Sequence, residues 1–428
     1  MSLNDLLFGD VWICSGQSNM EQSMVNIINS DEEIANSANL SQIRFTVIQN
    51  TIAYGVDDDL DVVLDFPWTD PSWSEALEEM SAICFLYGRS VFQETGVPQG
   101  LVASDWGGTP IESWTTGAVL DSCNVPAGPE PCAICDAEEC EGEMYCYSVL
   151  WNAMINPLKR NFVRGFLWYQ GETNGGYGGY PGFNRDYYQC TFPALITSWR
   201  EEFSAHSMTE KLAPFGFVQL AAWRPDSDEA SFPVIRWHQT ADQGYVPNKD
   251  MENVFMAVSL DTYDDKEGYP GNLHPRYKKV VAERLAVAGL NIAYGLDFPT
   301  SGPFPLSIES DGDAIIITYD KEPTYNANEI SGFYYCYCGS EMSCSQLEEC
   351  DAGVELSYWK EVPKGLVTQL SSNQIMIDLN HDKSFYLSYL WRETPVLTYL
   401  GLPVYDTVEP YLPSPPWKYL VEINTEGY

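Results

Sequence analysis

The stretch Val11–Met20, with the sequence VWICSGQSNM, decides how the first part of the chain folds. Val11–Cys14 is an apolar run typical of a short buried strand, and Ser15–Gln17 ends that run with a turn. An amphipathic pattern of Met and Ile residues at helical spacing begins at Met20. The stretch therefore predicts a strand, a tight turn and a helix in succession.

Ser18 lies where this strand ends and the helix begins. Ligands bind at the carboxyl ends of strands in open α/β sheets, and the free amides of a helix N-terminus favour negative charge. Ser18 is therefore a candidate nucleophile. Ser and Asn are also the residues that helix N-caps prefer, so the stretch by itself equally allows a purely structural cap.

The alternation of strand, polar turn and helix continues to about residue 299. Besides an alternating run at Gln42–Ile52, the further predicted strands are Gly100–Ser104, Val163–Tyr169, Phe215–Ala222 and Val254–Leu260. The further predicted helices are Ala82–Thr95, Ser148–Leu158, Tyr188–Phe203, Ile235–Gly244 and Arg276–Leu290. The acidic segment Gly55–Pro71 is predicted to be a surface loop. This alternation indicates an α/β fold with a parallel sheet.

The pattern changes after Pro299, where short apolar runs are separated by turn residues up to about Trp391. We predict an α/β domain over residues 1–299, with a cysteine-rich loop inserted at about 121–147. A smaller all-β module with a proline-rich tail is predicted over 300–428.

Twelve cysteines favour an oxidising compartment. Nine lie in two clusters, and we expect the cluster from Cys123 to Cys146 to be disulfide-bonded largely within itself. The alternative is a zinc site, although no second pair of CxxC knuckles follows. Its ligands would be Cys132, Cys135, Cys140 and Cys146.

The formal net charge is −39, which repels phosphate backbones and argues against a nucleic-acid partner. No apolar run is long enough to predict a membrane span, and residues 1–20 lack the pattern of a secretory leader. Asn39 begins a glycosylation sequon, which is compatible with secretion. The sequence carries no signal for an oligomeric state.

Several sequence blocks occur in the order typical of one known family. They are Gly9–Trp12 with Gly16–Met20, Ser104–Glu112, Trp168–Asn174, Arg236–Asp242 and His274–Pro275. Together they resemble the sialate O-acetylesterases, members of the wider SGNH hydrolase group, over roughly residues 9–290. The resemblance implies an SGNH-type fold of three layers, a parallel sheet flanked by helices, with Ser18 as the acylated residue. It also implies a secreted or lysosomal-type protein whose native signal peptide is missing from this chain.

The resemblance assigns the catalytic base to His274, between the fifth polar-ended strand and the last helix of the α/β domain. His238 is the lesser candidate for the base, and we interpret it as a packed or substrate-side residue. SGNH enzymes usually carry Asp three residues before the base, but Gly271 occupies that position. Asp261, at the end of the fifth strand, is the preferred triad acid. Nearby loop carboxylates or a backbone carbonyl could orient the imidazole instead; the carboxylates are Asp264, Asp265 and Glu267.

The expected oxyanion donors are the backbone N–H groups of Ser18 and Gly108 and the side-chain amide of Gln170. Gly107 is expected to let the backbone approach the substrate closely. Glu172 replaces the Asn that many SGNH proteins use and cannot donate when ionised, so we expect it to order Gln170, a loop or a substrate hydroxyl. Two further expected substrate contacts are Trp106 and Asn174.

The sequence therefore predicts a serine esterase that removes O-acetyl groups from a sugar or glycan, with O-acetylated sialic acid the preferred substrate and no metal or other cofactor. A deacetylase of acetyl xylan or another polysaccharide is the alternative within enzymes, and the negative charge suits a neutral polymer at least as well. A glycan-binding protein on a degenerate esterase scaffold is the alternative from another class. Retention of both Ser18 and His274 argues against the latter.

Overall fold

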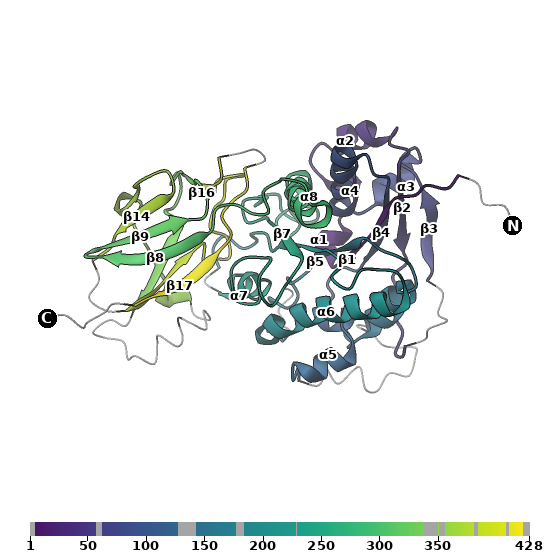
Figure 1. The fold of residues 1–428 in the computed structure, drawn as a ribbon, viewed down its shortest axis with the longest axis horizontal. Helices are drawn as coiled ribbons and strands as arrows, with labels where there is room; N and C mark the ends of the chain where they lie inside the picture. The colour runs from purple at the N-terminus through teal and green to yellow at the C-terminus, as the bar shows by residue number, and fades with distance from the viewer. Residues whose placement is uncertain are drawn as a thin grey trace. The chain divides into compact units, whose positions relative to one another are not determined.

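A computed structural model describes residues 5–56, 62–126, 143–176, 184–227, 229–337, 350, 356–380, 384–407 and 411–422. The chain divides into two compact units (Figure 1). The first comprises Met1–Val218, Pro247–Ala257 and His274–Thr300, and the second comprises Gln219–Val246, Val258–Leu273 and Ser301–Tyr428. Two segments that we predicted in the α/β domain thus group with the β-rich part. The predicted domain boundary at 299/300 remains a prediction.

A seven-stranded sheet, with the order β3-β2-β4-β1-β5-β6-β7, forms the centre of the α/β part. Its strands are β1 (Asp10–Gly16), β2 (Ile43–Ile48), β3 (Leu64–Thr69), β4 (Gln99–Asp105), β5 (Gly165–Tyr169), β6 (Phe215–Gln219) and β7 (Val254–Val258). Neighbours from β2 to β6 pair in parallel, and β3 pairs antiparallel with β2. The strand order reverses around β1, so the segment after β1 lies at the switch point where open α/β sheets bind ligands.

Helices cover both faces of this sheet, with α4 and α8 on one face and α5 and α6 on the other (Figure 1). The helices of the first unit are α1 (Ser18–Glu21), α2 (Ser30–Ser37), α3 (Ser74–Glu79), α4 (Ala82–Thr95), α5 (Gly117–Ser122), α6 (Tyr188–His206) and α8 (Lys278–Tyr294). Short 3₁₀ or π turns include η1 (Met24–Asn26), η2 (Ile111–Trp114), η5 (Trp151–Ile155) and η6 (Asn156–Leu158). The predicted three-layer α/β class is confirmed.

The turn after β1 depends on Gly16. Its φ of 138° is unfavourable for residues with a side chain, and a Cβ placed there would come 2.2 Å from the carbonyl oxygen of Tyr169. The N–H of Gln17 donates to that same carbonyl at 3.0 Å, which fixes the turn to the end of β5. α1 ends at Glu21, because Gln22 has a non-helical ψ of 114° and the extended Ser23 then forms a bridge with Ser81. The longer amphipathic helix predicted from Met20 is therefore wrong.

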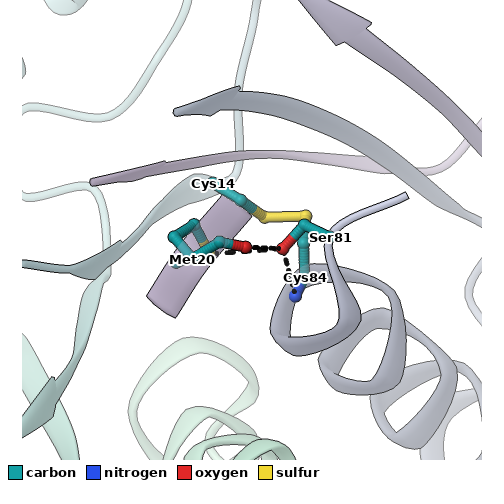
Figure 2. The surroundings of a disulfide bond; sticks show 4 residues. All are labelled: Cys14, Met20, Ser81 and Cys84. Carbon is teal, nitrogen blue, oxygen red and sulfur yellow. Dashed lines mark hydrogen bonds between the residues drawn. A yellow bond between two sulfur atoms is a disulfide. The ribbon is translucent and has the colours of Figure 1, made fainter. Parts of the chain in front are cut away.

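A disulfide between Cys14 and Cys84 joins β1 to the start of α4 (Figure 2). Beside it, the Ser81 hydroxyl donates to the carbonyl of Met20 at 2.6 Å and accepts from the N–H of Cys84 at 3.3 Å. Both cysteines are fully buried. The covalent bond and the serine bridge thus fix the segment that carries Ser18 against α4.

All seven cysteines in the described ranges are disulfide-bonded; they are Cys14, Cys84, Cys123, Cys146, Cys190, Cys336 and Cys350. Cys123 pairs with Cys190 at the start of α6, so the prediction that its cluster pairs largely within itself is wrong for this residue. The reason is tertiary, since α5 ends beside α6 and brings the two cysteines together. Cys146 is oxidised and thus cannot be a thiolate ligand for zinc, whereas Cys132, Cys135 and Cys140 lie outside the described residues.

We expect the double variant Cys14→Ala/Cys84→Ala to lower the free energy of unfolding by about 2 to 4 kcal/mol. The disulfide closes a loop with a sequence separation of 70, so its loss lets the unfolded chain gain conformational freedom. Urea unfolding of the variant and the wild-type protein measures the difference. Unchanged unfolding midpoints would contradict the prediction.

In its described residues, the second unit is built on three antiparallel sheets, with the orders β12-β11-β15-β17, β13-β14-β9-β8 and β10-β16. The strands are β8 (Pro305–Asp311), β9 (Ala314–Tyr319), β10 (Thr324–Tyr325), β11 (Phe333–Tyr337), β12 (Lys360–Glu361), β13 (Val367–Gln369), β14 (Gln374–Asp378), β15 (Phe385–Tyr389), β16 (Val404–Tyr405) and β17 (Trp417–Val421). The predicted all-β module is confirmed.

α7 (Ser231–His238) packs in this second unit. Val234 joins a buried aromatic cluster with Trp359 and Trp391, and the guanidinium of the fully buried Arg236 donates to the carbonyls of Arg392 and Glu393. These contacts explain why Gln219–Val246 groups with the β module. None of the helices in the described ranges is both long and apolar enough to span a membrane.

Candidate active site

Ser18 and His274 lie next to each other in the first unit, although they are 256 positions apart in sequence. The distance between Ser18 Oγ and His274 Nε2 is 2.8 Å, within the range required for proton transfer. Ser18 lies at the start of α1, and His274 lies shortly before α8. The two predicted residues are thus in the geometry of a nucleophile and its general base.

Burial and then the positive charge of Lys278 lower the pKa of His274 from 6.5 to about 4. The imidazole is therefore neutral at and well below neutral pH. A neutral imidazole can accept the proton of a serine hydroxyl, whereas an imidazolium cannot.

The loop after β4 lies against the nucleophile. The N–H of Trp106 donates to the carbonyl of Gly16 at 3.1 Å, and the N–H of Gly107 donates to Glu21 Oε2 at 2.9 Å. A Cβ on Gly107 would come 3.3 Å from Ser18 Cβ and 2.6 Å from Glu21 Oε2. A side chain at position 107 would therefore require Glu21 to move. That Gly107 lets the backbone approach the substrate stays a prediction. Trp106 is half-buried in the same loop.

The loop after β5 is hydrogen-bonded to the turn after β1 and to the loop after β4. The side-chain oxygen of Gln17 accepts from the N–H groups of Gly171 and Thr173, each at 3.3 Å. The Thr173 hydroxyl donates to the carbonyl of Gly108 at 2.9 Å. Gly108 has φ of 78°, a conformation that favours glycine. Three strand ends thus form one hydrogen-bonded platform around Ser18.

Gln170 is fully buried, and its side-chain nitrogen donates to the carbonyl of Thr109 at 3.1 Å and to Asn174 Oδ1 at 2.7 Å. An amide nitrogen carries only two hydrogens. Donation from Gln170 to an oxyanion would therefore require one of these bonds to break. Asn174 is fully buried too, and its nitrogen donates to Glu112 Oε2 at 3.0 Å.

Glu112, which sequence reasoning gave no role, supports this loop. It is fully buried, and burial raises its pKa to about 7 against the opposing hydrogen bond from Asn174. Gln170 and Asn174 thus belong to a polar network that orders the loop after β5.

Glu172 accepts a 2.5 Å hydrogen bond from the side-chain nitrogen of Asn19, the residue next to the nucleophile. Asn19 Oδ1 in turn accepts from the ammonium of Lys278 at 2.6 Å. Burial raises the pKa of Glu172, and the bond from Asn19 and the charge of Lys278 oppose that rise. Sequence reasoning missed Lys278. The sequence did contain a signal for its burial. Lys278 has helical spacing to Val281, Ala282 and Leu285, which form the buried face of α8.

Asp261 and His238 lie in the second unit, where each has its own partner. The fully buried Asp261 accepts a 2.6 Å hydrogen bond from the Tyr405 hydroxyl. His238 Nδ1 lies 2.6 Å from Asp242 Oδ1 at the end of α7. Among the side chains that the structure describes, no group of three or more His, Cys, Asp or Glu could hold a metal ion.

Two family models match the chain. The model described as "Carbohydrate esterase, sialic acid-specific acetylesterase" covers residues 8–269, and "Sialate O-acetylesterase C-terminal domain" covers residues 305–421. The first match includes Ser18 and the strand-end loops around it.

Curated relatives are similar over the whole chain. The sialate O-acetylesterase of Homo sapiens is 38% identical over 441 residues, which cover 100% of this chain and 78% of the human protein. The sialate O-acetylesterase of Mus musculus is 35% identical over 460 residues, which cover 100% of this chain and 80% of the mouse protein. The crystal structure of a carbohydrate acetylesterase from Xanthomonas citri has a TM-score of 0.72, with 24% identity over 96% of this chain and 80% of that one.

The structural similarity supports the fold, and the sequence matches confirm the resemblance seen in the motifs. A polysaccharide deacetylase and a non-catalytic glycan-binding protein are not favoured by these matches. The chain therefore belongs to the sialate O-acetylesterase family and is a carboxylic ester hydrolase.

Proposed function

We propose that this protein removes O-acetyl groups from sialic acid through an acetyl-enzyme on Ser18. The observation that carries the mechanism is the 2.8 Å distance between Ser18 Oγ and His274 Nε2. The substrate is inferred from the curated relatives, which are named sialate O-acetylesterases.

In the first half of the reaction, His274 takes the proton of Ser18 as the oxygen attacks the acetyl carbonyl. The backbone N–H groups of Ser18 and Gly108 are the proposed donors to the oxyanion. The tetrahedral intermediate then collapses, and His274 returns the proton to the departing sugar hydroxyl. The products of this half are the free hydroxyl and acetyl-Ser18.

In the second half, His274 activates a water molecule that attacks acetyl-Ser18, and acetate leaves as Ser18 regains its proton. Trp106 is a proposed substrate contact, supported by its half-buried position in the loop against Ser18. For Glu172 and Asn174 we propose an indirect role, because both side chains are buried and bonded within the site. His238 stays a proposed substrate-side residue.

Acetate release from O-acetylated sialic acid and from acetylated xylan, measured side by side, tests the substrate. We expect release from the sialic acid, and Ser18→Ala is the matched control for background hydrolysis. Release from xylan alone would overturn the sialate proposal while leaving the serine mechanism intact. The net charge of −39 repels an anionic sugar, so KM for the sialic acid should fall as ionic strength rises.

The pH profile of kcat/KM tests the electrostatics of the base. Because burial and Lys278 lower the pKa of His274 to about 4, the imidazole stays neutral at pH 5 and above, and activity is lost only as pH falls through about 4. A histidine with an ordinary pKa would lose activity around pH 6.5, about two units higher. An acid limb at that higher pH would contradict the prediction.

For the triad acid we propose Asp261, which would bind His274 Nδ1 and hold the ring in the productive tautomer. Its burial and the hydrogen bond from Tyr405 support a carboxyl group held in one fixed orientation. We expect Asp261→Asn to lower kcat about 10⁴-fold with little change in KM. Asp264→Asn is the matched control, because Asp264 is also buried and on the same loop. Loss of activity in the control alone would identify Asp264 as the acid. If Asp265→Asn and Glu267→Gln are silent as well as these two variants, a backbone carbonyl orients the imidazole.

We further propose that the protein works in an oxidising compartment, secreted or lysosomal, as a glycoprotein modified at Asn39. The disulfide bonds support the compartment. The exposed position of Asn39 supports the modification.

A further inference from the structure

The ammonium group of Lys278 contacts the two segments that carry the nucleophile and the base. Its Nζ donates to Asn19 Oδ1 at 2.6 Å and to the carbonyl of Pro275 at 2.9 Å. Asn19 directly follows Ser18, and Pro275 directly follows His274. One nitrogen atom therefore joins two residues that are each one position from a reacting group.

The surroundings of this nitrogen are buried and polar. Lys278 is 1% exposed, and its Nζ lies 5.4 Å from the centre of the Tyr169 ring at the end of β5. Asn19 connects it to Glu172, which is also 1% exposed, so a positive and a negative side chain lie on either side of one amide. Each charge lessens the cost of burying the other.

A purely structural role does not account for a lysine here. Lysine is almost never fully buried unless it is paired, and an apolar side chain would fill the same space without desolvating an ammonium. The contacts instead go to the two segments whose separation sets the distance between Ser18 and His274. Catalysis by proton transfer depends steeply on that distance.

We propose that Lys278 is a positioning residue, whose ammonium holds the Ser18 and His274 segments together through Asn19 and Pro275. This inference rests on the proposed function, because it assigns Lys278 a task in the reaction of Ser18 with His274. Glu172, which is joined to Lys278 through Asn19, balances the buried charge. The positive charge beside His274 also favours the neutral, proton-accepting imidazole.

The test compares Lys278→Met with Lys279→Met, using a chromogenic acetate ester as substrate. Methionine keeps the length of the lysine chain and removes the ammonium. Lys279 is a matched control, because it is the next residue on α8 but is half-exposed and pairs with Glu33 at 2.8 Å. We expect Lys278→Met to lower kcat about 100-fold with little change in KM, and Lys279→Met to leave kcat unchanged.

The pH profile adds a result that a structural role would not produce. Removing the positive charge of Lys278 raises the pKa of His274, so the acid limb of kcat/KM should move to higher pH in Lys278→Met. Lys279→Met should not move it.

Lys278→Met leaves the buried Glu172 without its counter-charge and could therefore unfold the protein. A second variant tests the inference in that case. In Lys278→Met/Glu172→Gln both charges are absent, so thermal stability should recover while kcat stays low. Wild-type kcat in either folded variant would overturn the positioning role. Ser18→Ala separates the two proposals. Near wild-type activity in Ser18→Ala would refute the proposed function, whereas a Ser18→Ala reduced to background hydrolysis beside a fully active Lys278→Met would refute only this inference.

Discussion

Ser18→Ala is expected to reduce kcat for acetyl ester hydrolysis by about 10⁶-fold, to the level set by the oxyanion donors and binding alone. The substitution removes one oxygen atom, the one that lies 2.8 Å from His274 Nε2. Without it no acetyl-enzyme can form, and water must attack the ester directly. The measurement is acetate release at saturating substrate, together with mass spectrometry for an acetylated intermediate, which should be absent.

Ser15→Ala is the matched control for this variant. Ser15 lies three residues earlier on β1 and is fully buried. Its hydroxyl has no hydrogen-bond partner within the part of the chain that the structure describes, so its removal should leave both fold and kcat unchanged. Near wild-type activity in Ser18→Ala would exclude this serine as the nucleophile, whatever the control shows.

The sequence best predicted the strands and helices in which apolar residues recur with one clear spacing. The apolar run before Gly16 is β1, and the predicted helix Ala82–Thr95 is α4 with the same bounds. β3 was predicted as part of a loop, because it is an edge strand that exposes most of its residues and contains Asp65 and Pro67. Its strand geometry comes from pairing with β2, which local sequence does not encode.

Two predicted helices differ for local reasons. Ser148–Leu158 contains a π turn followed by a 3₁₀ turn, and Pro157, which has no N–H to donate, lies in the second of them. The helix predicted from Ile235 begins earlier, at Ser231, and ends at His238, followed by Ala241 and Asp242 with positive φ. Both segments are rich in apolar residues, so periodicity alone does not fix their ends.

The sequence predicted those residues of the site whose role follows from their chemical type and from their position near the end of a strand. Ser18 follows β1, Gly107 follows β4 and His274 shortly precedes α8, and all three lie in the first unit. The predicted alternation of strands and helices places the carboxyl ends of the parallel strands at one edge of the sheet. Lys278 was missed because two consecutive lysines are typical of a solvent-exposed surface. Burial of the first and exposure of the second depend on how α8 packs.

His274→Ala is expected to reduce kcat about as much as Ser18→Ala, by about 10⁶-fold, because a nucleophile and its base act as one unit. The double variant Ser18→Ala/His274→Ala should be no slower than either single variant. Additive losses, with the double variant slower by the product of the two effects, would mean that the residues act independently. A separate measurement is the reaction of Ser18 with a phosphonate ester, which should be lost in His274→Ala although the serine is present.

Two other histidines serve as comparisons for His274→Ala. His206, at the exposed end of α6, contacts the carbonyl of Glu202 through Nδ1, and His206→Ala should be silent. His238 was the lesser candidate for the base, and its Nδ1 lies 2.6 Å from Asp242 Oδ1. If His238 were the base, His238→Ala would abolish phosphonate labelling of Ser18 and His274→Ala would not. The 2.8 Å contact between Ser18 and His274 favours the opposite result, because proton transfer in the acylation step requires the base within hydrogen-bond reach of the hydroxyl.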